Sequence, residues 1–240
     1  MDFWDPEPRT KDHVSLRGPC MGRQPLSEQV RARLTDGHVL PAPRVYPPGA
    51  MTAPPGELVA YHIGIVVGNL QAVADRYQRV LGVDRWRMRE VATVRMPWDA
   101  RSTDGRLNVA FGRAAGLTFE LLQPLDGCTP HMDFLEKHGD GVQHIGFWTP
   151  DVRAVVDNAV KEGGRITLAR LDPNGNAEVQ LSPGASMEAI VGRLPTDMIA
   201  YVDPGMGGVQ LEFIGPAGAA GLREWLGADF DTLLQPPPPW

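Results

Sequence analysis

The sequence of 240 residues contains only two cysteines, Cys20 and Cys128, too few for a disulfide framework or a thiolate metal site. No apolar run approaches the roughly 20 residues that a membrane helix needs, so we expect no membrane association. Basic residues are also few: Lys and Arg number 23 against 29 Asp and Glu, a net charge of −6. That balance argues against nucleic acid as a partner, because phosphate contacts need a basic surface. The first residues lack the basic end and apolar core of a signal peptide, so we expect a cytoplasmic protein.

Proline is plentiful but unevenly distributed. Ten of the 23 prolines precede Leu58. Proline removes backbone donors and interrupts helices, so residues 1–57 are predicted to form an N-terminal arm with little regular structure. This arm is either a flexible leader or a segment that packs on the body or on a second subunit. At the other end, residues 218–240 predict a short helix near Leu222–Trp225 and a proline-rich tail.

Between these ends the sequence contains two copies of one pattern. The stretch His62–Val67 and the stretch His144–Thr149 both begin His-Ile-Gly and lie 82 residues apart. Each stretch is rich in apolar and β-branched or aromatic residues, which predicts a strand. Apolar residues at helical spacing follow in both copies, over 70–81 and over 152–160, and predict amphipathic helices. The sequence therefore predicts an internal duplication.

Each copy continues alike. A glycine stands where each helix is predicted to end, Gly82 in the first copy and Gly164 in the second. Three strands should follow each helix. They are predicted over 86–93, 107–113 and 117–122 in the first copy and over 166–171, 198–202 and 209–214 in the second. This order predicts an α+β fold of two paired βαβββ modules around one cavity, with modules at 58–125 and 141–217 joined by a linker at 126–140.

Four polar residues occupy equivalent positions in these apolar strands. His62 and His144 begin the first strand of each copy, and Glu120 and Glu212 lie in the last strand of each copy. Burying two carboxylates near each other is unfavourable unless a cation compensates their charge. If the two modules face each other, two imidazoles and two carboxylates converge, and a divalent metal supplies that compensation. Such a donor set suits Zn, Co, Ni, Mn or Fe and leaves adjacent sites for a substrate with two neighbouring oxygens.

The duplicated pattern resembles the vicinal oxygen chelate superfamily, which includes glyoxalase I, methylmalonyl-CoA epimerases, extradiol dioxygenases and bleomycin resistance proteins. The resemblance covers roughly residues 58–217. Its most specific parts are Phe119–Leu125, Phe134–Gly139 and Gly141–Phe147, which are similar to the centre of methylmalonyl-CoA epimerases. It implies a vicinal oxygen chelate fold and a homodimer.

In those epimerases four residues hold a divalent metal, at positions that match His62, Glu120, His144 and Glu212 here. The metal chelates a thioester and a neighbouring carboxylate, and carboxylates move the proton. This sequence departs from the pattern twice. Gln143 stands where the epimerases often carry a first of two adjacent histidines, and the middle of the first module offers Asp99 and Asp104 but no glutamate base.

These observations favour a metal-dependent isomerase, epimerase or lyase that removes a proton beside a chelated carbonyl. Glu212 or Glu120 is the expected base, and no organic cofactor is expected. The first alternative is a non-haem iron extradiol-type dioxygenase, against which the fourth protein ligand counts. The second alternative is a non-catalytic resistance protein that binds a small molecule in the same cavity.

Other polar residues give weaker signals. Six arginines lie around the middle strands of the first module, and the pattern favours a solvated face over an anion site. They are Arg85, Arg87, Arg89, Arg95, Arg101 and Arg106. His131 and His138 lie in the polar linker and are predicted to be surface residues.

Overall fold

The structure is a computed structural model that describes residues 58–93, 97–98, 101–102, 105–127, 129–170, 186–205 and 208–234. These residues belong to one compact unit of the chain, Tyr46–Trp240. The predictions made for the arm at 1–57, for Asp99 and Asp104, and for the proline-rich end at 235–240 lie outside the described residues. Within the described ranges, no helix has the length and apolar character to cross a bilayer.

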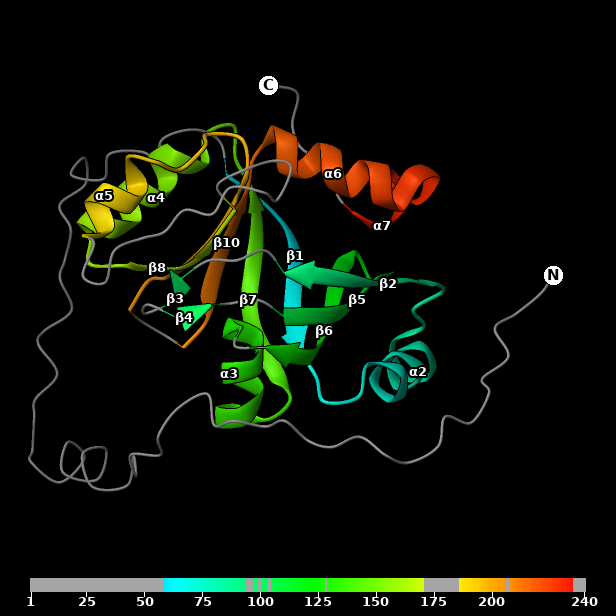
Figure 1. Cartoon of the computed structure of the whole chain (residues 1–240). Coiled ribbons are helices and arrows are strands. Elements are labelled where there is room, and N and C mark those ends of the chain that lie inside the picture. Colours follow the sequence, from blue (N-terminus) through cyan, green and yellow to red (C-terminus); the bar gives the residue numbers. More distant parts are fainter. Residues whose placement is uncertain are drawn as a thin grey trace, which may run out of the picture. The chain divides into compact units, whose positions relative to one another are not determined.

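Eight strands form one mixed, curved sheet in the order β2-β5-β6-β1-β7-β10-β9-β8 (Figure 1). Their bounds are β1 Val59–Val66, β2 Trp86–Thr93, β5 Gly105–Ala114, β6 Leu117–Gly127, β7 Gly141–Trp148, β8 Arg165–Ala169, β9 Ile199–Asp203 and β10 Gln210–Ile214. A separate pair of two-residue strands is formed by β3 (Pro97–Trp98) and β4 (Arg101–Ser102). Strands β1 and β7 are antiparallel at the centre, and each pairs in parallel with the last strand of its own half, β6 or β10. The α+β class and the order strand, helix, three strands are thus confirmed.

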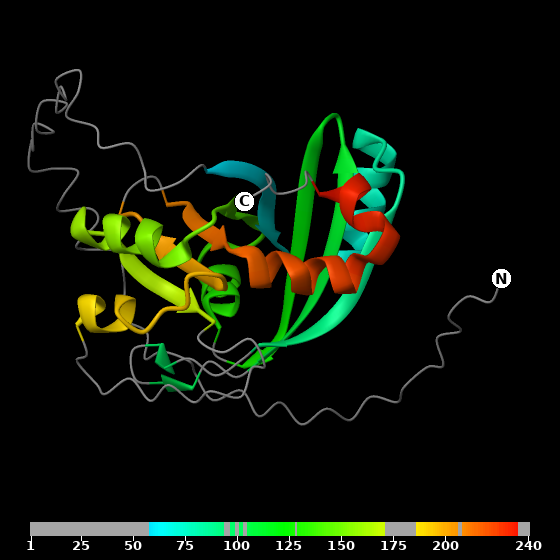
Figure 2. The same cartoon turned by 90° about the horizontal axis from the view of Figure 1, so that it is seen from above.

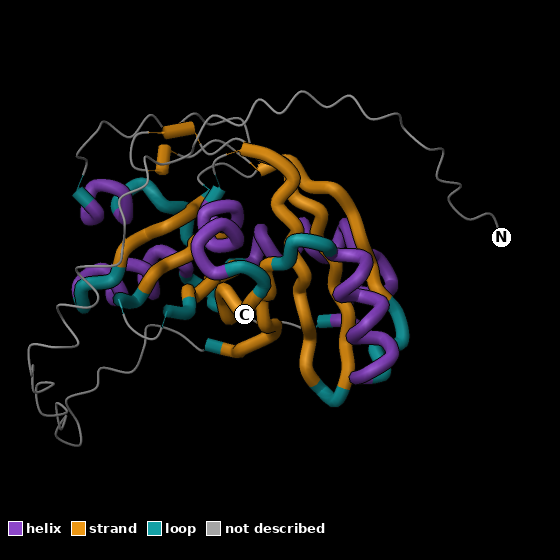
Figure 3. Tube along the Cα trace, turned by 90° about the horizontal axis from the view of Figure 1, so that it is seen from below, coloured by secondary structure: helices purple, strands orange, loops and turns teal. Residues whose placement is uncertain are grey.

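Helices cover the sheet at its two sides and at one end (Figures 2 and 3). Their bounds are α2 Leu70–Leu81, α3 Pro130–His138, α4 Val152–Lys161, α5 Met187–Val191, α6 Pro216–Leu226 and α7 Phe230–Leu233, with a 3₁₀ turn at Gly227–Asp229. Helix α2 packs against β5 and β6, and α4 packs against β8, β9 and β10. The two helices that follow β1 and β7 therefore cover equivalent strands in the two halves.

The ends of α2 and α4 follow from their capping residues. The side chains of Asn69 and Asp151 each accept a hydrogen bond from the backbone three residues on, which starts the two helices. Helix α2 ends at Gly82, whose φ of +69° is the left-handed conformation that glycine adopts readily. After α4 that conformation falls on Gly163, at φ +94°, and not on Gly164. The prediction for Gly82 is confirmed, and that for the second glycine was wrong by one residue.

The C-terminal helix is longer than the sequence predicted near Leu222–Trp225. Helix α6 begins at Pro216 and leads through the 3₁₀ turn into α7. Five side chains of this segment are buried in the same cluster as residues of β1, β5, β6 and β7: Ala219, Leu226, Phe230, Leu233 and Leu234. Glycine disfavours helix formation, so Gly218 weakened the helix signal in the sequence. In the structure a Cβ at this position would lie only 2.8 Å from the side chain of Ile214. The glycine allows α6 to pack tightly against β10.

The arginines around β2 are exposed, as predicted, and three of them also contact the C-terminal segment. Arg85 and Arg87 both form ion pairs with the buried carboxylate of Asp229, just before α7. The guanidinium of Arg89 lies over the ring of Trp225 in α6, 4.2 Å from its centroid. These contacts attach the C-terminal segment to the edge of the first half of the sheet.

Candidate metal centre

Each of the two central strands has a β-bulge directly before its histidine. In the pairing of β1 with β7, Tyr61 has no partner between Ala60 and His62, and Gln143 has none between Val142 and His144. A bulge inserts one extra residue and redirects the side chains around it. Tyr61 and Gln143 are consequently buried alongside the histidines that follow them, although simple alternation would place neighbours on opposite faces.

The glycine of each His-Ile-Gly motif makes room for the histidine of the other copy. Gly64 lies opposite His144, and Gly146 lies opposite His62. A Cβ on Gly64 would lie 2.0 Å from the imidazole of His144, and a Cβ on Gly146 would lie 2.2 Å from that of His62. Both rings therefore lie directly over the neighbouring strand, and only glycine permits this arrangement.

The structure brings together the four residues that the sequence singled out. His62 Nε2 lies 2.9 Å from His144 Nε2, 3.0 Å from Glu120 Oε2 and 3.2 Å from Glu212 Oε2. His144 Nε2 lies 3.1 Å from Glu120 Oε2 and 3.8 Å from Glu212 Oε2. One ligand atom from each residue lies within 4.8 Å of the other three, and all four side chains are buried.

This donor set fits a divalent cation. Ligand atoms bind such ions at about 2.1 Å, so neighbouring ligands at right angles are about 3 Å apart. Four of the five distances above are 2.9–3.2 Å. Gln143 Oε1 lies 3.2 Å from His144 Nδ1, so that nitrogen carries the hydrogen and Nε2 keeps a lone pair for a metal.

The carboxylate of Glu120 is charged within this buried group. Burial opposes ionisation of Glu120, but the charges and hydrogen bonds of His62 and His144 outweigh it and hold the pKa of Glu120 below its usual range. Burial likewise opposes protonation of His62, but Glu120 and Glu212 outweigh it and raise its pKa above the ordinary value. The site thus attracts positive charge, which a bound cation would satisfy.

Two tyrosines surround Glu212. The hydroxyl of Tyr61 donates a hydrogen bond to Glu212 Oε2 at 3.1 Å, and the Tyr61 ring stacks on Trp148 with centroids 3.8 Å apart. Burial and the charge of Glu212 raise the pKa of Tyr61 and of Tyr201 well above the ordinary value. Both phenols therefore stay protonated at neutral pH and can donate hydrogen bonds.

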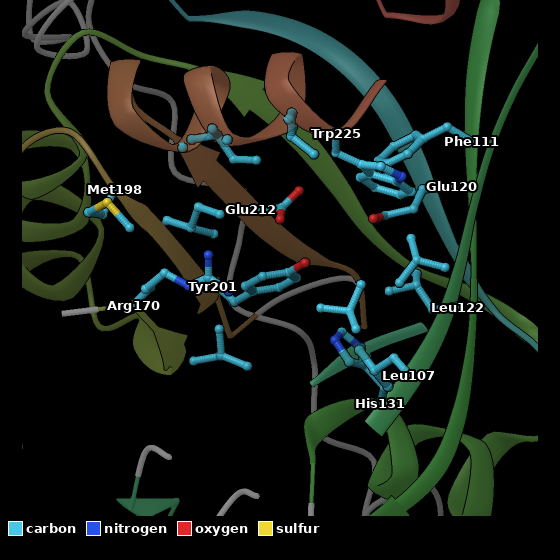
Figure 4. A pocket seen from close by; sticks show the side chains of 18 of the residues that line it. Leu107, Phe111, Glu120, Leu122, His131, Arg170, Met198, Tyr201, Glu212 and Trp225 are labelled. Carbon is cyan, nitrogen blue, oxygen red and sulfur yellow. The ribbon is translucent and has the colours of Figure 1, made fainter. Parts of the chain in front are cut away.

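A cavity of about 230 Å³ opens beside the four donors (Figure 4). Its walls come from both halves of the sheet and from α6. Most of its lining is apolar and includes Val109, Phe111, Leu122, Ile214, Leu222 and Trp225. Glu120 and Glu212 face it, so a small molecule in the cavity would contact both carboxylates.

Three further polar side chains line this cavity, and the sequence predicted none of them as site residues. They are Arg89, His131 and Arg170. The prediction that His131 lies at the surface was wrong, since it is only 3% exposed, whereas His138 of the same helix is exposed as predicted. His131 is held by Gln143, at 2.7 Å between Nδ1 and Oε1. Gln143 in place of a second histidine was the one signal that could have led to His131.

Comparison with known proteins agrees with this geometry. Residues 61–179 match the family model of the Glyoxalase/Bleomycin resistance protein/Dioxygenase superfamily. An ethylmalonyl-CoA/methylmalonyl-CoA epimerase of Cereibacter sphaeroides is 32% identical over 106 residues, which cover 44% of this chain and 71% of the epimerase. The chain belongs to this superfamily.

Two further similarities are to a bacterial protein and to a solved structure. The uncharacterized protein YqjC of Bacillus subtilis is 34% identical over 86 residues, or 36% of this chain. This chain spans about half of that relative, 54% of its length. The crystal structure of methylmalonyl-CoA epimerase from Mycobacterium tuberculosis matches with a TM-score of 0.41 and 22% identity, covering 68% of this chain and 91% of that one. Superfamily members commonly bind divalent metals, and the buried His/Glu group here could hold one.

Proposed function

We propose that this chain is a divalent-metal-dependent isomerase, epimerase or lyase that removes a proton next to a carbonyl, as methylmalonyl-CoA epimerases and glyoxalases do. The observation that carries the proposal is the convergence of His62, Glu120, His144 and Glu212 on the wall of a largely apolar cavity. The epimerase from Cereibacter sphaeroides supports the same class of reaction.

The proposed metal ligands are those four side chains, and the proposed ion is Zn, Co, Ni, Mn or Fe. A bound divalent ion polarises a carbonyl and so acidifies the neighbouring C–H group. The apolar walls from Val109, Phe111 and Leu122 exclude water, which strengthens each charge interaction inside the cavity.

Glu212 is the proposed base, with Glu120 as the other carboxylate within reach of the cavity. Glu212 accepts a hydrogen bond from Tyr61, which orients the carboxylate toward the cavity. The abstracted proton would reside on a carboxylate oxygen of Glu212 before it returns to the substrate or passes to solvent.

Two arginines support an anionic substrate with adjacent oxygens. Arg89 in the edge strand β2 and Arg170 just after the other edge strand, β8, line the same cavity. Burial, and after it the charge of Arg170, lowers the pKa of Arg89. Neither guanidinium has an ion-pair partner in the described part of the chain. The two positive guanidinium groups repel each other. A carboxylate or phosphate on the substrate would relieve that repulsion through bidentate hydrogen bonds.

The test is exchange of the α-hydrogen with solvent. Full-length protein loaded with Co²⁺ or Zn²⁺ is incubated in heavy water with methylmalonyl-CoA, with methylmalonate and with small 2-oxo and 2-hydroxy acids, and the mass of each compound is followed. We expect a one-deuterium mass shift in at least one of them. Glu212→Gln should slow this exchange by about 100-fold or more while keeping an oxygen ligand for the metal.

The same experiment separates the alternatives. Oxygen consumption by Fe²⁺-loaded protein with a catechol, and no exchange on any carbon acid, would replace the proposal with a dioxygenase. Binding without exchange or oxygen consumption would replace it with a small-molecule-binding protein. The homodimer and the cytoplasmic location implied above stay predictions, and sedimentation of the purified protein checks the first of them.

A further inference from the structure

His131 stands apart from the other polar groups of the cavity because it belongs neither to the metal donors nor to the sheet. It lies in the first turn of α3, which joins the two halves of the sheet, and its ring points into the cavity in Figure 4. The ring lies edge-on to Tyr201, with centroids 5.8 Å apart. In Figure 4 the Tyr201 ring lies between the imidazole of His131 and the carboxylate of Glu212.

The hydrogen bonds of Gln143 determine which nitrogen of His131 carries the hydrogen. Gln143 Nε2 donates to the carbonyl of Pro130 at 3.1 Å, so Gln143 Oε1 is directed at the histidines and can only accept. His131 Nδ1, 2.7 Å from that oxygen, is therefore the donor. His131 Nε2 consequently keeps its lone pair on the nitrogen that Gln143 does not occupy.

The ring is also buried, at 3% exposed, and lines the cavity without being one of the four metal donors. The cavity thus contains a proton acceptor that a bound metal would leave free, whereas Glu120 and Glu212 would be shared with the ion.

We propose that His131 is the second proton-transfer residue of this cavity and serves the face of the substrate carbon opposite the face that Glu212 serves. The inference rests on the proposed function. In one direction His131 Nε2 takes the α-proton, and the electron pair of the broken C–H bond moves toward the carbonyl oxygen. The pair then forms a new C–H bond on the opposite face with a proton that Glu212 has taken from water. His131 releases its proton to water, so the substrate is inverted and nothing else is consumed.

The stereochemistry of exchange tests this role. The two epimers of methylmalonyl-CoA are incubated separately in heavy water with metal-loaded wild type, His131→Gln and His138→Gln. In the wild type both epimers should gain deuterium and interconvert. In His131→Gln interconversion should fall by about 100-fold or more. One epimer, the one served by Glu212, should still exchange within a few-fold of the wild-type rate, while the other should not. His138→Gln, an exposed histidine in the same helix, should behave as the wild type.

Each other outcome has a distinct meaning. An unchanged rate in His131→Gln, or an equal loss for both epimers, overturns the inference and leaves the proposed function intact. Absence of exchange in the wild type overturns the proposed function and with it the role of His131. Metal content and the unfolding curve of His131→Gln, expected to match those of the wild type at pH 7, show that the variant is folded and loaded.

A second measurement needs no substrate. Long-range ¹H–¹⁵N spectra of the full-length protein at pH 7, with and without Zn²⁺, report which imidazole nitrogen of each histidine carries a hydrogen, and His131→Gln assigns the signal. We expect the tautomer with hydrogen on Nδ1 and a free Nε2 in both states. Hydrogen on Nε2 of His131 would overturn the inference.

Discussion

In the first half of the sheet, the residue that bulges beside the metal-site histidine is Tyr61; in the second half the equivalent residue is Gln143. Tyr61 supports a carboxylate, through its hydrogen bond to Glu212, whereas Gln143 supports imidazoles, through His144 and His131. The nitrogen Nδ1 of His62 has no hydrogen-bond partner in the described structure, while Nδ1 of His144 has one. The duplication supplies matching donors, and the bulge residues make their surroundings unequal.

The largest expected effect is the loss of bound metal when one donor is removed from either half. His62→Ala and His144→Ala should each lose the single divalent ion that we expect per chain, because the remaining three donors cannot compensate for the missing imidazole. Metal analysis of purified protein after dialysis measures this loss. Stoichiometric metal retained in both variants would contradict the four-residue site.

Alanine at the facing glycines should act almost as strongly and equally in both halves. In Gly64→Ala the new Cβ displaces the ring of His144, and in Gly146→Ala it displaces that of His62. We expect metal affinity to fall by about 100-fold or more and stability to fall by about 1–3 kcal/mol. Gly192→Ala is the control, since the nearest atom to its Cβ would be 3.6 Å away. Competition with a chelator and urea unfolding give the two quantities, and a Gly64→Ala protein with wild-type affinity would rule out this steric account.

Substitution of the bulge residues should reveal the inequality of the halves. Gln143→Leu leaves two buried imidazole N–H groups without an acceptor, so we expect about 10- to 100-fold weaker metal binding and about 1–3 kcal/mol lower stability. Tyr61→Phe keeps the stacking on Trp148 and loses only the hydrogen bond to Glu212, so metal affinity should change by a few-fold at most. Calorimetric titration with Zn²⁺ compares them. Equal losses in the two variants would show that the halves support the site alike.

The smallest effect concerns pH. The pKa of His131 is about 4 in the folded protein and about 6.5 when unfolded, so between these values the unfolded chain binds more protons. The free energy of unfolding of the wild type should therefore fall, relative to that of His131→Gln, by up to about 3 kcal/mol as the pH drops from 6.5 to 4. No such loss is expected above pH 6.5. Urea unfolding of metal-free protein across this range measures it, and a difference that stays constant would mean that His131 is not buried in its neutral form.

The sequence by itself determined the duplication, the order of strands and helices, the end of α2 at Gly82, and the four residues that converge in the structure. These features are readable because alternation, helical spacing and capping depend on neighbours within a few positions. The equivalence of two copies then related His62 to His144 and Glu120 to Glu212 before any contact was known.

Only the tertiary structure decided what surrounds those four residues. The bulges at Tyr61 and Gln143 break the alternation from which burial is inferred. His131 belongs to a linker helix whose burial depends on the sheet it covers, and the polar sequence around it predicts exposure. Arg89 and helix α6 meet only because the sheet curves so that its edge strand β2 reaches the C-terminal segment. The contact between Arg89 and Trp225 joins residues more than a hundred positions apart, and no local pattern in the sequence records it.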